Sequence, residues 1–240
     1  MNILMLYFLC VCMLVIMLVS GHFIGFKASV NFYACEKCSS KETTASQLAE
    51  KLIAHNKLLN VKMSCLNAKK TNYYSASYNV IKLSPEVKNS NNLSALAKSA
   101  YCANQARLSH RFGFLYIIKT AFSFISKPFP IIFIPLTLVC AILHTSTGAS
   151  VAELLILITL IGTLTSFLIE IIIFLFEVKS VKSLIKDIKQ LDEFSEEETK
   201  IISSLLYDIC KADFYMSTRL ILKFLALLNP DPIFKQNNKA

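Results

Sequence analysis

The chain has 240 residues, of which 54% are hydrophobic and 17% are charged, and its mean hydropathy is +0.52. An ordinary soluble domain carries roughly 45–50% apolar and about 25% charged residues, so this composition argues against one and predicts contact with lipid. Basic residues outnumber acidic ones by 25 to 16. Beside hydrophobic segments such an excess marks the cytoplasmic side of a membrane more often than a nucleic-acid site, so we expect no nucleic acid as partner.

The distribution of apolar segments predicts a mostly α membrane protein with three to four transmembrane helices and a small α/β-type cytoplasmic region. Residues 1–26 are expected to form an N-terminal transmembrane anchor, followed by a basic cytoplasmic region at 27–111. Residues 112–176 are expected to form a membrane region with a transmembrane hairpin. Residues 177–240 then provide a cytoplasmic helix and a C-terminal amphipathic or membrane helix.

The N-terminal segment begins with an unbroken apolar run at residues 3–19. A bilayer span needs about 20 apolar residues, so the run is long enough for an anchor. A secretory signal peptide normally starts with positive charge, yet no Lys or Arg precedes Lys27. Because positive charge follows the run, we expect the N-terminus outside and the bulk of the soluble region in the cytoplasm.

The basic region contains signals for two helices and two strands. A capping box at Thr44–Gln47 begins a helix that continues to about His55, and the Ala-rich segment Leu93–Leu108 predicts a second helix. Short strands are expected at 61–63 and at Val80–Leu83. The polar stretch between these strands reads as a turn, so the sequence predicts a small α/β-type unit.

The second half of the chain alternates apolar and charged segments. Residues 112–126 are apolar but carry Lys119, which favours an interfacial or partly inserted helix. Residues 128–143 and 151–176 are expected to form the transmembrane hairpin. A capping box at Ser195–Glu198 then predicts a cytoplasmic helix, and residues 214–228 an amphipathic or membrane helix.

Familiar catalytic motifs are missing from the sequence. It contains no glycine-rich phosphate-binding loop, no G-x-S-x-G, and no H-x-x-x-H pair that would place two imidazoles on one helix face. Cys35 and Cys38 form one isolated C-x-x-C, which we interpret as two unlinked thiols. Composition and spacing alone therefore indicate no active site.

Three segments nevertheless follow one another in a recognisable order. Residues 44–56 are similar to T-A-x-x-x-A-x-x-[IL]-L-x-x-N, and residues 74–87 to Y-D-P-x-x-x-x-[LI]-x-L-S-x-x-V without its Asp-Pro. Residues 93–106 stand where S-x-x-A-x-x-x-A-A-H-E-x-G-H-A is expected. Together the segments resemble the YugP-type membrane zinc metallopeptidases, or neutral zinc metallopeptidases, and the chain is identified as a divergent member lacking the HExxH motif.

The resemblance assigns the family's site residues to four positions. The two zinc-binding His fall on Tyr101 and Gln105, and the general-base Glu falls on Cys102. A third ligand, a Glu that ends a later membrane helix, falls on Glu177. One usual ligand out of three does not hold a catalytic zinc, so we expect no zinc unless the family activity is retained.

These replacements predict a catalytically inactive protein that acts as a scaffold or partner-binding protein. The lipid bilayer and another membrane protein are the expected partners. The strand at Val80–Leu83 is a candidate edge for pairing with an extended peptide that is bound but not cut.

Two other functions fit the sequence. A divergent but active metallopeptidase would recruit Cys102, His110 or Glu177 as ligands in a new arrangement. Alternatively, the chain is a small structural subunit of a membrane complex. Cys102, a lone Cys in an Ala-rich helix, is more typical of inert packing than of a nucleophile.

Overall fold

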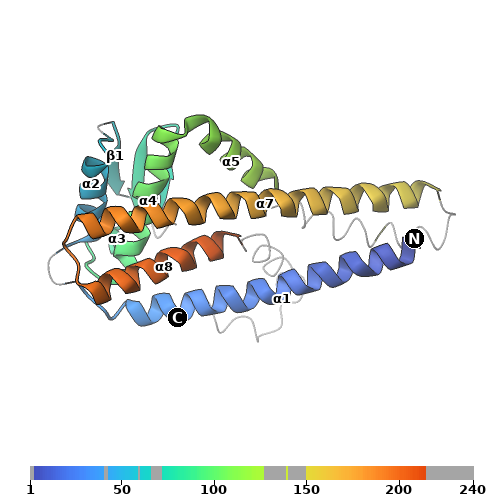
Figure 1. Ribbon diagram of the computed structural model, residues 1–240, viewed down its shortest axis with the longest axis horizontal. Helices are drawn as coiled ribbons and strands as arrows, with labels where there is room; N and C mark the ends of the chain where they lie inside the picture. The colour runs from blue at the N-terminus through green and yellow to red at the C-terminus, as the bar shows by residue number, and fades with distance from the viewer. Residues whose placement is uncertain are drawn as a thin grey trace. The chain divides into compact units, whose positions relative to one another are not determined.

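The computed structural model describes residues 3–40, 43–58, 60–65, 72–126, 139 and 150–214. The elements follow in the order α1 (Ile3–Cys35), α2 (Ala45–His55), β1 (Lys62–Cys65), β2 (Tyr73–Ser75), β3 (Val80–Leu83), α3 (Pro85–Lys88), α4 (Leu93–Arg111), α5 (Gly113–Ser126), α7 (Ser150–Gln190) and α8 (Glu196–Phe214) (Figure 1). The described part of the chain is thus mostly helical, with one small sheet.

The chain divides into two compact units. One consists of residues 1–25, 121–172 and 212–240, and the other of residues 26–120 and 173–211. The second unit contains the sheet, helices α2 to α4, and the ends of α1, α5, α7 and α8 that fall in its ranges. All residues of the site discussed below belong to this second unit.

Three short strands form the sheet in the order β1-β3-β2. Strand β1 runs parallel to β3, with Met63 opposite Ile81, and β2 runs antiparallel to β3, with Tyr74 also opposite Ile81. The predicted strand at Val80–Leu83 is therefore confirmed, and the one predicted at 61–63 is found slightly later, at Lys62–Cys65. Since β3 is paired on both sides, the expectation that it offers an edge to a peptide is wrong.

Strand β2 was not expected, because its surroundings are polar and turn-like. Its Tyr73 and Tyr74 are aromatic residues, which favour a half-buried pleated surface. Tyr74 is buried, and its hydroxyl donates to Oδ1 of Asn79 over 2.7 Å. Tertiary burial of one aromatic ring thus outweighs the polar character of the segment.

The predicted helix starts are confirmed by their caps. Thr44 and Gln47 form a complete capping box at α2. At α8, the backbone N–H of Ser195 donates to Oε2 of Glu198, and the N–H of Glu198 donates to Oγ of Ser195. Helix α4 is capped by Asn92 and continues to Arg111, slightly beyond its predicted end.

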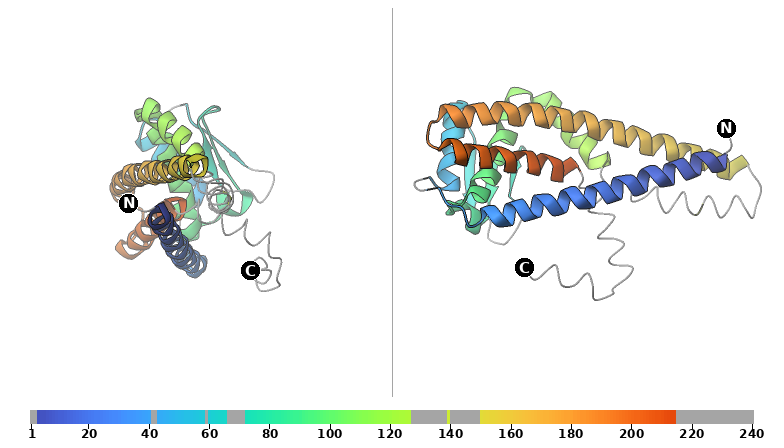
Figure 2. Two further views of the ribbon diagram at one scale, coloured as in Figure 1. Left: turned by 90° about the vertical axis from the view of Figure 1, so that its right-hand side faces the viewer. Right: turned by 60° about the horizontal axis from the view of Figure 1, so that its bottom comes forward.

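The core of the second unit surrounds helix α4, which packs along α2 and lies against β2 and β3 (Figures 1 and 2). Five of its buried residues are alanines, whose small side chains let neighbouring elements approach closely: Ala95, Ala97, Ala100, Ala103 and Ala106. The charged end of α7 and helix α8 complete this core with Val181, Leu184, Ile188, Ile202, Leu205 and Leu206.

The prediction of three to four transmembrane helices is wrong. Within the described ranges, no helix combines the length and the apolar character needed to cross a membrane. The prediction treated the apolar runs at 3–19 and 151–176 as separate spans. In the structure each run is one part of a longer helix, α1 or α7, whose other part carries charges and joins the core of the second unit.

Other predicted segments have mixed outcomes. Residues 113–126 form a helix, α5, as expected. The predicted span at 128–143 lies outside the described residues except for Val139, and so does the segment 214–228 after its first residue. Cys35 and Cys38 are both free thiols, as the sequence indicated.

Candidate functional site

The positions that the family resemblance singled out are brought together in the second unit. Tyr101 and Gln105 lie one turn apart on α4, so they share a face of that helix. Glu177 lies on α7, and the hydroxyl of Tyr101 donates to its Oε1 over 3.1 Å. Residues 76 positions apart in the chain therefore meet at one point.

Glu177 is the buried acid of this cluster, with only 2% of its surface exposed. A buried carboxylate without a partner would be strongly unfavourable. Its partners are the Tyr101 hydroxyl and the ammonium of Lys119, which forms an ion pair with the same Oε1. Glu177 is thus a buried, charge-paired residue of the core.

Lys119 is the residue that the sequence reasoning missed. It lies on α5, and its side chain is 12% exposed. Besides the ion pair with Glu177, its ammonium donates to Oε1 of Gln105 over 3.1 Å and lies 5.7 Å from the centre of the Tyr116 ring. The available signal was a single cation within an otherwise apolar helix.

Tyr116 closes the same cluster from α5. Burial raises the pKa of its phenol to about 12, with smaller contributions from Tyr74 and then Glu177. The rings of Tyr74 and Tyr116 pack edge to face with centres 6.3 Å apart. Tyr116 is therefore neutral near pH 7 and offers the ammonium the face of an uncharged ring.

Cys102 occupies the position that the resemblance assigns to the general base. Its side chain is buried, and burial raises the pKa of its thiol to about 12. The thiolate is the nucleophile and the metal ligand, so a thiol that remains protonated serves as neither near neutral pH. Cys102 therefore behaves as a small core residue.

The ligands proposed for a divergent metallopeptidase do not come together. His110 lies at the exposed end of α4, where its Nε2 shares a 2.9 Å hydrogen bond with Oδ1 of Asn79. In the part of the chain that the structure describes, no three His, Cys, Asp or Glu side chains are grouped as a metal site would need. The alternative arrangement of Cys102, His110 and Glu177 thus has no geometric support.

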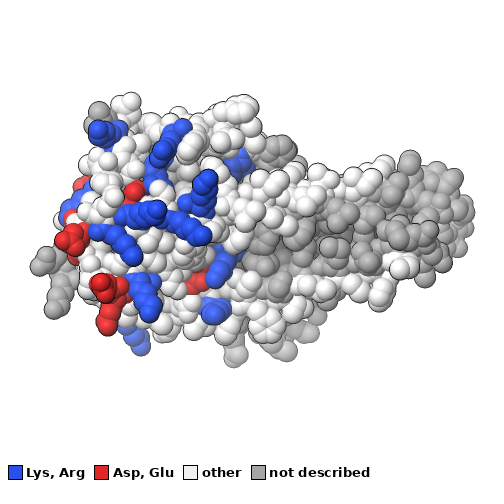
Figure 3. All heavy atoms as spheres, in the orientation of Figure 1, with Lys and Arg blue, Asp and Glu red and all other residues white. Residues whose placement is uncertain are grey.

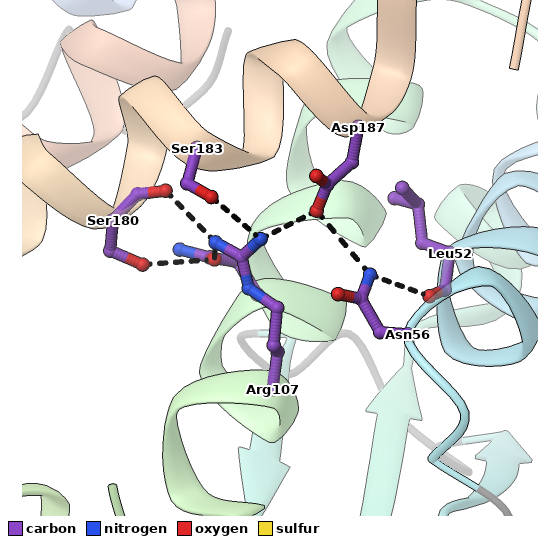
Figure 4. Close-up of polar contacts among 7 residues, drawn as sticks. Leu52, Asn56, Arg107, Ser180, Ser183 and Asp187 are labelled. Atoms are coloured by element: carbon purple, nitrogen blue, oxygen red, sulfur yellow. Dashed lines mark hydrogen bonds and ion pairs between the residues drawn. The ribbon is translucent and has the colours of Figure 1, made fainter. Parts of the chain in front are cut away.

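A second buried polar network holds α4 against α7 (Figure 4). Arg107, 7% exposed, donates to Oδ2 of Asp187, to Oγ of Ser183 and to the carbonyl oxygen of Ser180. Its second terminal nitrogen also donates to Oδ1 of Asn104 over 2.7 Å. The Ser180 hydroxyl donates to the same Asn104 oxygen.

This network extends to the end of α2. The Asn56 amide donates to Asp187 over 3.4 Å and to the carbonyl oxygen of Leu52 over 3.0 Å (Figure 4). A guanidinium has a planar fork of donors, which suits several acceptors on neighbouring helices. The arrangement fixes the helix that carries Tyr101 and Gln105 relative to the helix that carries Glu177.

Comparison with known proteins identifies the class. Residues 5–106 match the model of a family described as "Putative neutral zinc metallopeptidase", and they cover slightly less than half of the chain. The resemblance inferred from the sequence is thereby confirmed, and the chain is zinc metallopeptidase-like. No curated protein and no solved structure shows significant similarity to it.

The family implies zinc, but the residues at this site do not fit it. Zinc in proteins is bound by Cys, His, Asp or Glu, and Glu177 alone of the three assigned ligand positions is of that kind. The ammonium of Lys119 contacts the oxygens of both Glu177 and Gln105. A divalent cation placed between those oxygens would meet a fixed positive charge.

Proposed function

We propose that this protein is a catalytically inactive relative of the neutral zinc metallopeptidases that acts as a scaffold or partner-binding protein. The observation that carries the proposal is the surroundings of Glu177. The Tyr101 hydroxyl donates to its carboxylate and the Lys119 ammonium pairs with it, while Lys119 also donates to Gln105. These contacts neutralise the buried acid, and the position assigned to the general base holds Cys102 instead of a carboxylate.

Zinc content and proteolysis test this proposal together. The protein, purified in mild detergent, is analysed for zinc per chain and incubated with casein, with and without a chelator. We expect zinc far below one per chain and no chelator-sensitive cleavage. Stoichiometric zinc together with chelator-sensitive cleavage would contradict the proposal and favour the divergent metallopeptidase.

A lipid bilayer is the partner that we propose first, and helix α5 supports it. Its large apolar side chains Phe114, Leu115 and Ile117 are exposed, whereas its single charged residue, Lys119, is almost buried. This distribution is the reverse of that on an ordinary surface helix. Exposed apolar side chains close together on one helix are typical of protein or membrane contact surfaces.

A stripe of lysines on α7 provides a second argument for an anionic lipid surface. Lys179, Lys182, Lys186 and Lys189 are all exposed, and their spacing of three and four residues places them on one side of the helix. Lys and Arg side chains gather over this part of α7 in Figure 3. Each such charge contributes about 1 kcal/mol of attraction near an anionic membrane.

Vesicle binding tests the lipid proposal. We expect the protein to co-sediment more strongly with vesicles containing phosphatidylserine than with neutral ones, and to lose that preference in Lys182→Gln/Lys186→Gln. The matched control is Lys62→Gln/Lys200→Gln, which removes two other exposed charges. Equal loss in both variants would contradict a specific role for the stripe.

We also propose that the basic region lies in the cytoplasm and that another membrane protein co-purifies with this one. Nucleic acid is not proposed, and retention of an RNA or DNA oligonucleotide at the salt concentration of the vesicle assay would contradict that expectation.

A further inference from the structure

We infer that the ammonium of Lys119 takes the place of a metal cation among the three positions that the sequence resemblance assigns to zinc ligands, where it contacts Gln105 and Glu177. The inference rests on the proposed loss of the zinc site and adds the reason why that site is closed. Tyr101, Gln105 and Glu177 come from two helices, and Lys119 reaches them from a third.

The contacts of Lys119 are those of a bound cation. Its Nζ forms an ion pair with Oε1 of Glu177 and donates to Oε1 of Gln105 over 3.1 Å. An ammonium has three donors and no acceptor, so oxygen acceptors suit it. The face of the Tyr116 ring, 5.7 Å away, adds a further favourable contact for a positive charge.

The replacements at the ligand positions match an ammonium better than a metal. At position 105, a Gln carbonyl oxygen accepts a hydrogen bond from Lys119. At position 101, a Tyr hydroxyl donates to the Glu177 carboxylate, and this second donor satisfies the oxygen that it shares with Lys119. Both substitutions thus support the same buried ion pair.

Charge explains why the cation has to be present. Glu177 is 2% exposed, so loss of Lys119 would leave a buried carboxylate with a neutral hydroxyl donor, Tyr101, but without a counter-charge. Lys119 supplies that charge covalently, and it also attaches α5 to α4 and α7. A cation that belongs to the chain cannot be removed by a chelator or exchanged for zinc.

The wild type and three variants test whether Lys119 blocks the metal's place or whether the metal ligands are simply missing. The first is the wild type, and the second is the triple variant Tyr101→His, Cys102→Glu, Gln105→His, which restores the family's motif. The third combines the triple variant with Lys119→Met, which keeps the stem of the side chain and removes its charge. Zinc per chain is measured by elemental analysis after dialysis against micromolar zinc, and folding is checked by thermal melting.

We expect no stoichiometric zinc in the wild type or in the triple variant, and about one zinc per chain once Lys119 is also replaced. Stoichiometric zinc in the triple variant would overturn the inference, because Lys119 would then not occupy the metal's place. If both variants melt cooperatively and neither binds zinc, the inference is overturned as well. Zinc in the wild type would instead contradict the proposed function.

The fourth protein is the single variant Lys119→Met, which tests the ion pair without any metal. Its melting temperature should fall by roughly 10 °C, and Glu177→Gln added to it should recover most of that loss. The matched control is Lys51→Met, which breaks the more exposed pair of Lys51 with Glu193 and should change the melting temperature little. If Lys119→Met melts like Lys51→Met, the ammonium is not needed and the inference is overturned.

Discussion

Single side chains decide whether the surroundings of Glu177 suit a metal ion or an ion pair. Glu177 would serve either as a zinc ligand or as the anion of a buried pair, and its own chemistry does not choose between them. Lys119 makes Glu177 the anion of a buried pair, because its ammonium contacts both Glu177 and Gln105. The role of one residue is therefore set by a neighbour 58 positions earlier in the chain.

Cys102 allows a prediction at the same scale. Because burial raises its pKa to about 12, roughly one thiol in ten thousand is ionised at pH 8, and the side chain is also inaccessible. Iodoacetamide should leave Cys102 unmodified in the folded protein and modify it in denaturant, as read by peptide mass spectrometry. The exposed Cys38 is the internal control and should react in both states.

Rapid modification of folded Cys102 would show that the thiol is accessible and would revive its interpretation as a nucleophile.

The raised pKa of Cys102 also makes the stability of the fold depend on pH. A thiol whose pKa is higher in the folded protein stabilises the fold below the unfolded pKa, and this contribution is lost as the pH rises toward about 12.

At the level of elements, helix α4 carries the site and depends on its cap. Oδ1 of Asn92 accepts hydrogen bonds from the Ala95 N–H over 2.7 Å and from the Ser94 hydroxyl over 3.1 Å. We expect Asn92→Ala to lower the free energy of unfolding by about 1 kcal/mol, measured by urea denaturation. Asn92→Asp keeps the acceptor and is the control, so equal losses in both variants would contradict a capping role.

The Arg107 network joins α4 to α7 and gives a larger effect. Arg107→Met leaves Asp187 and Asn104 without their main partner, so we expect a loss of about 3–5 kcal/mol in the free energy of unfolding. The stability of Arg107→Lys should lie between that of the wild type and that of Arg107→Met, because a lysine keeps the charge but not the planar fork.

The control for this prediction lies four residues further along α4. Arg111 is exposed and lies over the ring of Phe112, so Arg111→Met should cost well under 1 kcal/mol in urea denaturation. Similar losses for the two arginines would show that the buried network does not stabilise the fold.

At the level of the whole molecule, we expect chelators to leave the thermal stability of the protein unchanged. A protein whose core is joined by zinc loses stability when the metal is removed, whereas a covalently attached ammonium is unaffected. The melting temperature should therefore be the same with and without EDTA. A clear decrease in EDTA would show that a metal does contribute to the fold.

Local signals in the sequence predicted many of the elements. The capping boxes at Thr44 and Ser195 begin α2 and α8, and the strand at Val80–Leu83 is found at its predicted residues. These signals succeed because a cap or a β-branched run acts over a few neighbouring residues. Local signals did not predict the short strand β2, because it depends on tertiary burial of Tyr74.

Residue types in their order along the chain were enough to reveal the resemblance to the neutral zinc metallopeptidases and the lack of an HExxH motif. The partners of Glu177 became known only from the fold. The contacts of Tyr101 with Glu177 and of Lys119 with Gln105 join separate helices, and no local pattern encodes them. The extent of helices α1 and α7 also became known only from the fold, because hydropathy marks an apolar run but does not show that the helix continues past it and packs into a core.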